Sequence, residues 1–272
     1  DKGSELEKIQ QAVKKFRKTK NVKIKIALIE QYTFLLDARD DEGNTALSRA
    51  VEIGTLQQIQ RLRALGANIE EGKISYSQEE GRMIHRTPVE VAFIHRKIDK
   101  LKKLIELGGD TTTIMATLDY DDYDSSNYFT SNKIGRFLRI LADFHEAVAR
   151  GDDIAPLLRE DSWIVNSKNA DGLTALHLAV KNRHEQVVQR LIEGGANVDA
   201  ATTKSEGTPL MLAASMGNLG MVRILLECNA NLDVRAINGT TAIFNAAYFR
   251  KMEVVQVLLE AGADNADADL TK

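Results

Sequence analysis

Apolar residues recur three and four positions apart in several stretches of the chain, which is the spacing of one face of an α-helix. In the run EQVVQRLIE, the apolar stripe consists of Val187, Val188, Leu191 and Ile192. Gly195 follows this stripe, and glycine readily takes the left-handed conformation that ends a helix. Similar stripes with similar endings recur along the chain, and they predict short helices separated by tight turns.

A shorter helix is predicted before each stripe. Thr174, Thr208 and Thr241 each follow a glycine-containing turn, and a threonine hydroxyl at this position can accept a hydrogen bond from a free backbone N–H. Pro88 and Pro209 each come directly after a threonine, at the first helical position, where a missing N–H costs nothing. Each unit is therefore predicted to be a helix–turn–helix.

These units repeat with a nearly constant period, since Ala179, Ala213 and Ala246 are 34 and 33 residues apart. One unit cannot bury its own apolar face, so neighbouring units are expected to stack. The copies that follow the plan span residues 41–70, 86–110, 171–200, 206–234 and 238–264.

The run Thr174-Ala175-Leu176-His177, at a period near 33, resembles the T-P-L-H-x-A pattern of ankyrin repeats. The resemblance covers most of residues 41–110 and 137–265. It implies an all-α ankyrin-repeat solenoid of stacked helix–turn–helix units joined by β-hairpin-like loops. It also implies that the His177 ring hydrogen-bonds backbone groups and ties neighbouring hairpins together.

Departures from the repeat divide the chain further. Two helices expected at 4–18 and 22–36 would cap the solenoid, and their lysines are expected on a solvated face rather than in a basic binding patch. The predicted organisation is an N-terminal helical cap at 1–40, two repeats at 41–110 with a hairpin insertion at 72–83, an acidic Tyr-rich insertion at 111–136, a degenerate repeat at 137–169, three repeats at 170–265 and a tail at 266–272.

Composition narrows the class of protein. The net charge of −3 gives no basic field for nucleic acid, and no apolar run approaches the roughly 20 residues of a membrane span. The opening DKGSELEK does not resemble a signal peptide, and the single cysteine fits a reducing compartment. We therefore expect a monomeric protein of the cytoplasm, or of a host cytosol if it is a secreted effector, with a protein partner.

The sequence contains no recognisable catalytic, cofactor or metal site. Cys228 has no nearby histidine in the sequence. A cluster of aspartates at 119–124 lacks the glycine and glutamate that an EF-hand requires. This acidic stretch is predicted to be either a flexible loop or a partner-docking loop, with phosphorylation as a further possibility. Its docking residues would be Tyr120, Tyr123, Tyr128 and Phe129.

The resemblance implies that hairpin tips and the exposed face of each first helix line a concave groove. Apolar residues at Met216, Tyr248 and Phe249 favour a binding patch, although Tyr248 and Phe249 could instead cover the core of the last repeat beside Phe244. In the later repeats the candidates are Asp171, Leu173, Lys181, Asn182, Ser215, Met216, Ile237, Asn238, Tyr248 and Phe249; in the earlier ones they are Asp41, Glu42, Asn44, Glu52, Ile53, Ile94 and His95.

The expected function is that of a protein–protein interaction module: an adaptor, scaffold or targeting domain, within a larger protein or a bacterial effector. It would bind its partner through the concave groove and the 111–136 insertion. Two alternatives stay open at this point. One is a regulatory or inhibitory subunit that masks a site on its partner. The other is an enzyme whose site combines the insertion with His95 or His145.

Overall fold

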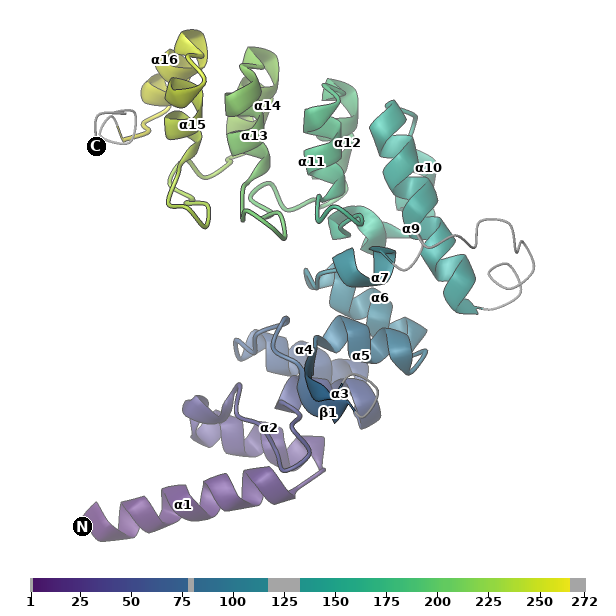
Figure 1. Ribbon diagram of the computed structural model, residues 1–272, viewed down its shortest axis with the longest axis vertical. Coiled ribbons are helices and arrows are strands. Elements are labelled where there is room, and N and C mark those ends of the chain that lie inside the picture. Colours follow the sequence, from purple (N-terminus) through teal and green to yellow (C-terminus); the bar gives the residue numbers. More distant parts are fainter. Residues whose placement is uncertain (1, 78–80, 117–132, 265–272) are drawn as a thin grey trace. The chain divides into compact units, whose positions relative to one another are not determined.

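The structure is a computed structural model that describes residues 2–77, 81–116 and 133–264. Figure 1 shows the chain as a succession of short helices joined by tight loops. The chain divides into two compact units, Asp1–Gly109 and Asp110–Lys272. Each unit is described by itself below, as the first unit and the second unit.

The first unit is built from helices and one two-stranded hairpin. Helix α3 packs on α4, α5 packs on α6, and α3 also contacts α5, so two helix pairs stack on each other. The elements are α1 (Lys2–Lys18), α2 (Val22–Gln31), η1 (Thr33–Leu35), α3 (Ala46–Ile53), α4 (Leu56–Ala64), β1 (Lys73–Ser77), β2 (Arg82–Arg86), α5 (Pro88–Ile94) and α6 (Ile98–Glu106).

The hairpin insertion predicted at 72–83 forms the antiparallel strands β1 and β2, in a register that pairs Lys73 with Arg86 and Ser77 with Arg82. The hairpin is attached to the loop before it, because the Ile74 backbone N–H donates to the Gly43 carbonyl at 3.0 Å. A side chain at Gly43 would collide with the backbone of Ile74, so this close approach requires glycine.

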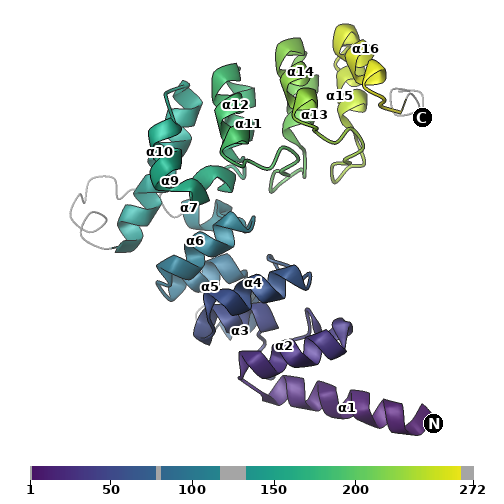
Figure 2. The same ribbon diagram turned by 180° about the vertical axis from the view of Figure 1, so that it is seen from behind.

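The second unit repeats one helix pair three times. Figures 1 and 2 show the pairs α11/α12, α13/α14 and α15/α16 side by side, with the first helices in one row and the second helices in another. The elements are α7 (Thr112–Ala116), α9 (Lys133–Arg150), α10 (Ala155–Glu160), η2 (Ser162–Asn166), α11 (Ala175–Lys181), α12 (Glu185–Glu193), α13 (Pro209–Met216), α14 (Leu219–Glu227), α15 (Ala242–Tyr248) and α16 (Met252–Glu260).

The local rules that predicted these helices are visible in their ends. The hydroxyls of Thr174, Thr208 and Thr241 each accept the backbone N–H three residues on. Gly195 and Asn229 follow second helices with positive φ angles of 89° and 60°. Caps and turns are therefore determined by the same few residue types in every copy.

Adjacent loops of the second unit are joined by one recurring hydrogen bond. The Asn197 backbone N–H donates to Asn166 Oδ1, and the Asn231 backbone N–H donates to Asp199 Oδ1, both at 2.8 Å. In the first unit, the Asn68 N–H donates to an oxygen of Asp37 at 3.2 Å in the same way. A side-chain acceptor of one repeat thus fixes the backbone of the next.

Helices enter both ends of the predicted 111–136 insertion. Helix α7 begins at Thr112 and buries Ile114 and Met115, and α9 begins at Lys133. The stacked rings of Phe137 and Trp163, with centroids 4.8 Å apart, join α9 to η2. The candidate docking residues Tyr120, Tyr123, Tyr128 and Phe129, and the aspartate cluster at 119–124, lie outside the described residues.

Candidate protein-binding surface and a buried ion network

The ends of the three first helices form the candidate surface of the second unit. We call residues 181–184, 215–218 and 248–251 the turn ridge; they complete α11, α13 and α15 and lead into the second helices. Each turn contains one residue in the left-handed conformation, with φ of 62° at Arg183, 68° at Gly217 and 55° at Arg250. The three turns therefore share one backbone geometry while carrying different side chains.

Neighbouring turns of the ridge are close to each other. Helix α13 packs against both α11 and α15, and the aliphatic stem of Lys251 lies against Gly217. A Cβ atom added at Gly217 would come within 2.6 Å of Lys251 Cδ. The last turn thus covers part of the preceding one, and the two form one surface.

Aromatic side chains dominate the last turn. Tyr248 is 62% exposed and Phe249 is 52% exposed, and their rings meet edge to face with centroids 5.2 Å apart. The half-buried Phe244 lies nearly parallel to Tyr248 at 6.2 Å. Phe244 supports the ring of Tyr248, while Tyr248 and Phe249 present apolar area to solvent.

The remaining candidates of the later repeats differ in exposure. Ile237 is 71% exposed at a hairpin tip, whereas the Ser215 hydroxyl is half-buried and donates to the Leu212 carbonyl at 2.8 Å. Exposed side chains are better placed for a partner than half-buried ones. The exposed set is Asp171, Lys181, Asn182, Ile237, Asn238, Tyr248 and Phe249, and the half-buried set is Leu173, Ser215 and Met216.

His177 joins two loops, as the resemblance implied. Its Nε2–H donates to the Gly207 carbonyl at 3.0 Å, and its Nδ1 accepts from the Thr174 hydroxyl at 2.8 Å. Burial lowers the pKa of His177 to about 4, although the hydrogen bond to the carbonyl opposes that shift. The ring is therefore neutral at physiological pH and structural.

His145 has the same role, which the sequence reasoning missed. Its Nε2 lies 3.1 Å from the Ser167 hydroxyl and 3.2 Å from the Ser167 carbonyl, and burial lowers its pKa to about 4. The signal was present, because His145 precedes Ala147 by the same two positions that separate His177 from Ala179. A buried, hydrogen-bonded ring is not placed for the catalytic role that was left open for it.

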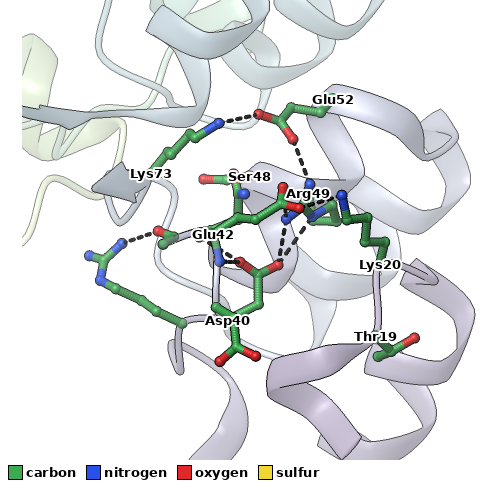
Figure 3. Close-up of polar contacts among 12 residues, drawn as sticks. Thr19, Lys20, Asp40, Glu42, Ser48, Arg49, Glu52 and Lys73 are labelled. Carbon is green, nitrogen blue, oxygen red and sulfur yellow. Dashed lines mark hydrogen bonds and ion pairs between the residues drawn. The ribbon is translucent and has the colours of Figure 1, made fainter. Parts of the chain in front are cut away.

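The first unit contains a buried ion network around Asp40 (Figure 3). Arg49 donates to one carboxylate oxygen of Asp40 through Nη2 at 2.8 Å and Nε at 3.1 Å. Lys25 Nζ lies 3.4 Å from the same oxygen and donates to the Phe16 carbonyl at 2.8 Å. Lys25 is fully buried, so the expectation that the cap lysines are all solvated is wrong for this residue.

Burial and ion pairing shift the pKa values of this network in opposite directions. Burial would raise the pKa of Asp40, but hydrogen bonds from Arg49 and from the Asn44 backbone, with the charge of Lys25, outweigh it and hold that pKa below its ordinary value. Burial lowers the pKa of Lys25, and Asp40 only partly opposes this. The carboxylate therefore stays ionised and joins α2 to α3.

Several early-repeat candidates belong to this network instead of a free surface. Glu42 pairs with Arg49 at 2.9 Å and also with Lys20, and Glu52 bridges Arg49 and Lys73 at 3.0 Å each (Figure 3). Asn44 is fully buried, so its prediction as a binding residue is wrong. The repeat register places Asn44 near a hairpin tip, but its side chain is buried inside the first unit.

Metal sites and membrane spans were the other kinds of feature to consider in the described residues. Within residues 2–77, 81–116 and 133–264, no group of three or more histidine, cysteine or acidic side chains is arranged to hold a metal ion. None of the helices in the same ranges has both the length and the apolar character of a membrane span.

Stacked helix pairs that present a row of variable turns on one invariant backbone define a repeat-built binding scaffold. A family model for ankyrin repeats matches residues 144–236 and 199–269. Residues 144–269 are thus built of ankyrin repeats, and this similarity supports a protein-interaction module.

Three curated relatives illustrate the similarity. The human B-cell lymphoma 3 protein is 28% identical over 84% of this chain and 45% of its own length. The chicken nuclear factor NF-kappa-B p105 subunit is 27% identical over 66% of this chain and 17% of its own length. The fruit-fly palmitoyltransferase Hip14 is 31% identical over 38% of this chain and 16% of its own length. The chain spans less than half of each relative.

Proposed function

We propose that this module is an adaptor or scaffold that holds a partner protein on the turn ridge and the hairpin tips of the second unit. The observation that carries the proposal is the exposed ring pair of Tyr248 and Phe249. Large aromatic side chains at a surface are typical anchors of protein interfaces. The 111–136 insertion is proposed as a second contact, and the module as a monomer that acts by binding without catalysis.

A cellular location is part of the same proposal. A chain with one cysteine fits a reducing environment, so we propose that binding takes place in the cytoplasm.

Met216 lies next to the left-handed Gly217 in the neighbouring turn, and its flexible thioether adds apolar contact area that adapts to a partner.

The test is a double substitution, Tyr248→Ala with Phe249→Ala. Because both rings are more than half exposed, we expect partner capture from cell lysate to fall sharply while the thermal unfolding midpoint changes little. Affinity capture with quantitative mass spectrometry measures the first quantity, and circular dichroism measures the second.

Met83→Ala is the matched control, because Met83 is 58% exposed but lies on β2 of the first unit. It should leave capture unchanged. A large loss of stability in the double variant would place the two rings in the core of the last repeat, and unchanged capture would remove the ridge from the interface.

A further inference from the structure

The turn ridge is strongly cationic although the whole chain is not. Its positions include Lys181, Arg183, Arg250 and Lys251 and no carboxylate, whereas the net charge of the chain is −3. In the part of the chain that the structure describes, none of these four side chains forms an ion pair or a side-chain hydrogen bond. Two unpaired cations therefore lie in the same turn as the exposed rings, and two more lie on the first turn of the ridge.

Some cations elsewhere in the second unit are paired within the fold. In the corresponding turn after α9, Arg150 pairs with Glu146 at 2.7 Å and with Asp152 at 2.9 Å. On the second helices, Arg190 pairs with Asp153. The ridge itself contains no carboxylate that could pair with its four cations.

Two of the ridge arginines occupy backbone positions that favour glycine. Arg183 and Arg250 have φ angles of 62° and 55°, and the equivalent positions in the other two repeats are Gly151 and Gly217, at 81° and 68°. Glycine takes this conformation freely, whereas a side chain there is disfavoured. The backbone conformation gives no reason for arginine at these positions, and such an outlier is a motive for a functional hypothesis.

We propose that the turn ridge binds an acidic segment of the partner protein, one that combines carboxylate side chains with an apolar side chain. The inference rests on the proposed function and names the chemistry of the partner. The guanidinium groups of Arg183 and Arg250 would each take a carboxylate, in the forked geometry that arginine provides. The apolar side chain would pack on Tyr248 and Phe249, with Met216 beside them.

An acidic polypeptide fits this surface better than a nucleic acid. The hairpin tips at the other end of the first helices carry Asp171 and Glu206, both exposed, and these carboxylates would repel an extended phosphate backbone that followed those helices. A segment whose carboxylates are few and separated can place them on the ridge and avoid the tips.

Fluorescence anisotropy with labelled synthetic peptides tests the inference on the full chain. One peptide combines glutamates with leucine, a second has glutamine for every glutamate, a third has lysine for every glutamate, and a single-stranded oligonucleotide serves as the polyphosphate probe. We expect the glutamate peptide to bind about tenfold more tightly than the glutamine peptide, and to weaken as salt is raised.

The decisive variant is Arg183→Gly with Arg250→Gly. It removes two cations and relieves two left-handed side-chain conformations, so the unfolding midpoint should stay constant or rise while the preference for glutamate falls about tenfold. The control, Arg159→Gln with Arg223→Gln, removes two exposed arginines from second helices and should keep the full preference.

Equal affinity for the glutamate and glutamine peptides would overturn the inference, and so would a higher affinity for the lysine peptide. It would also be overturned if the oligonucleotide bound more tightly than the glutamate peptide and that binding depended on Arg183 and Arg250. A lysate partner whose capture depends on Tyr248 and Phe249 but not on Arg183 and Arg250 would also overturn it, and would leave the proposed function standing. Capture independent of all four residues would contradict both.

Discussion

At the scale of single residues, burial decides which polar side chains are structural. His145 and His177 both lie inside the second unit, and each donates a hydrogen bond to the loop of the following repeat. The resemblance pointed to His177 only, because a threonine marks the start of its helix and none marks the corresponding position before His145. Each histidine thus ties its own helix to the loop of the following repeat.

These histidines make stability depend on pH. Their pKa values of about 4 lie below the ordinary value of 6.5, so the unfolded chain takes up protons first and stability is lost as pH falls from 6.5 towards 4. Each histidine should contribute a loss of about 2 kcal/mol between pH 6.5 and 5. Urea unfolding of the full chain at several pH values measures the slope.

The variant His177→Gln is the comparison. The variant should be less stable at every pH measured. Its free energy of unfolding should nevertheless fall less steeply between pH 6.5 and 5, and the difference in slope is the contribution of His177. An unchanged slope would mean that folding does not shift the pKa of His177. The acidic side chains common to both proteins cancel in the difference.

At the scale of helices, caps stabilise elements that are too short to persist alone. Helix α4 has nine residues and begins with a capping box: the Thr55 hydroxyl accepts from the Gln58 N–H at 3.3 Å, and the Gln58 side chain accepts from the Thr55 N–H at 2.9 Å. Thr55 is exposed, so its contribution comes from these bonds and not from packing.

Thr55→Ala should therefore reduce the free energy of unfolding by about 1 kcal/mol. The control Gln57→Ala removes an exposed side chain from the same first turn and should change stability by less than about 0.5 kcal/mol. Urea unfolding followed by circular dichroism measures both variants. Equal effects would show that the box contributes nothing beyond ordinary helix propensity.

Helices could be predicted from the sequence because their signals are local. Thr174, Pro209 and Gly195 each act within one turn of their own position, and the structure confirms all three. The network of Lys25, Asp40 and Arg49 could not be predicted, since these residues lie on different elements and resemble solvated charges in the sequence.

The candidate surface was only half predictable. The repeat register located Tyr248 at a helix end, but Phe244, one helical turn earlier, has the same apolar character and is half-buried. Only packing distinguishes an exposed ring from a covering one. The unpaired state of the ridge cations was likewise hidden, because it depends on which carboxylates the fold brings near.

At the scale of the whole molecule, a repeat array transmits little over distance, because each repeat contacts only its neighbours. Asp40→Asn should cost about 3 kcal/mol, since it leaves the buried charge of Lys25 without its carboxylate and removes one of the three carboxylates paired with Arg49. Asp41→Asn breaks only the exposed pair with Arg17 and should cost less than about 1 kcal/mol.

Hydrogen exchange followed by mass spectrometry locates the effect of Asp40→Asn. Exchange should quicken in α2, α3 and α4 of the first unit and stay unchanged in α13 to α16 of the second. Faster exchange in every helix would show that the chain unfolds as one cooperative body, contrary to nearest-neighbour stacking.

The recurring loop bond, from Asn197 to Asn166 and from Asn231 to Asp199, has a consequence for how such a chain can change in length. Each of these two joints presents an oxygen acceptor on one side and a backbone donor on the other. A duplicated repeat would meet a ready partner at both of its edges. Gene duplication or protein engineering could therefore lengthen the second unit by whole repeats without redesigning any joint.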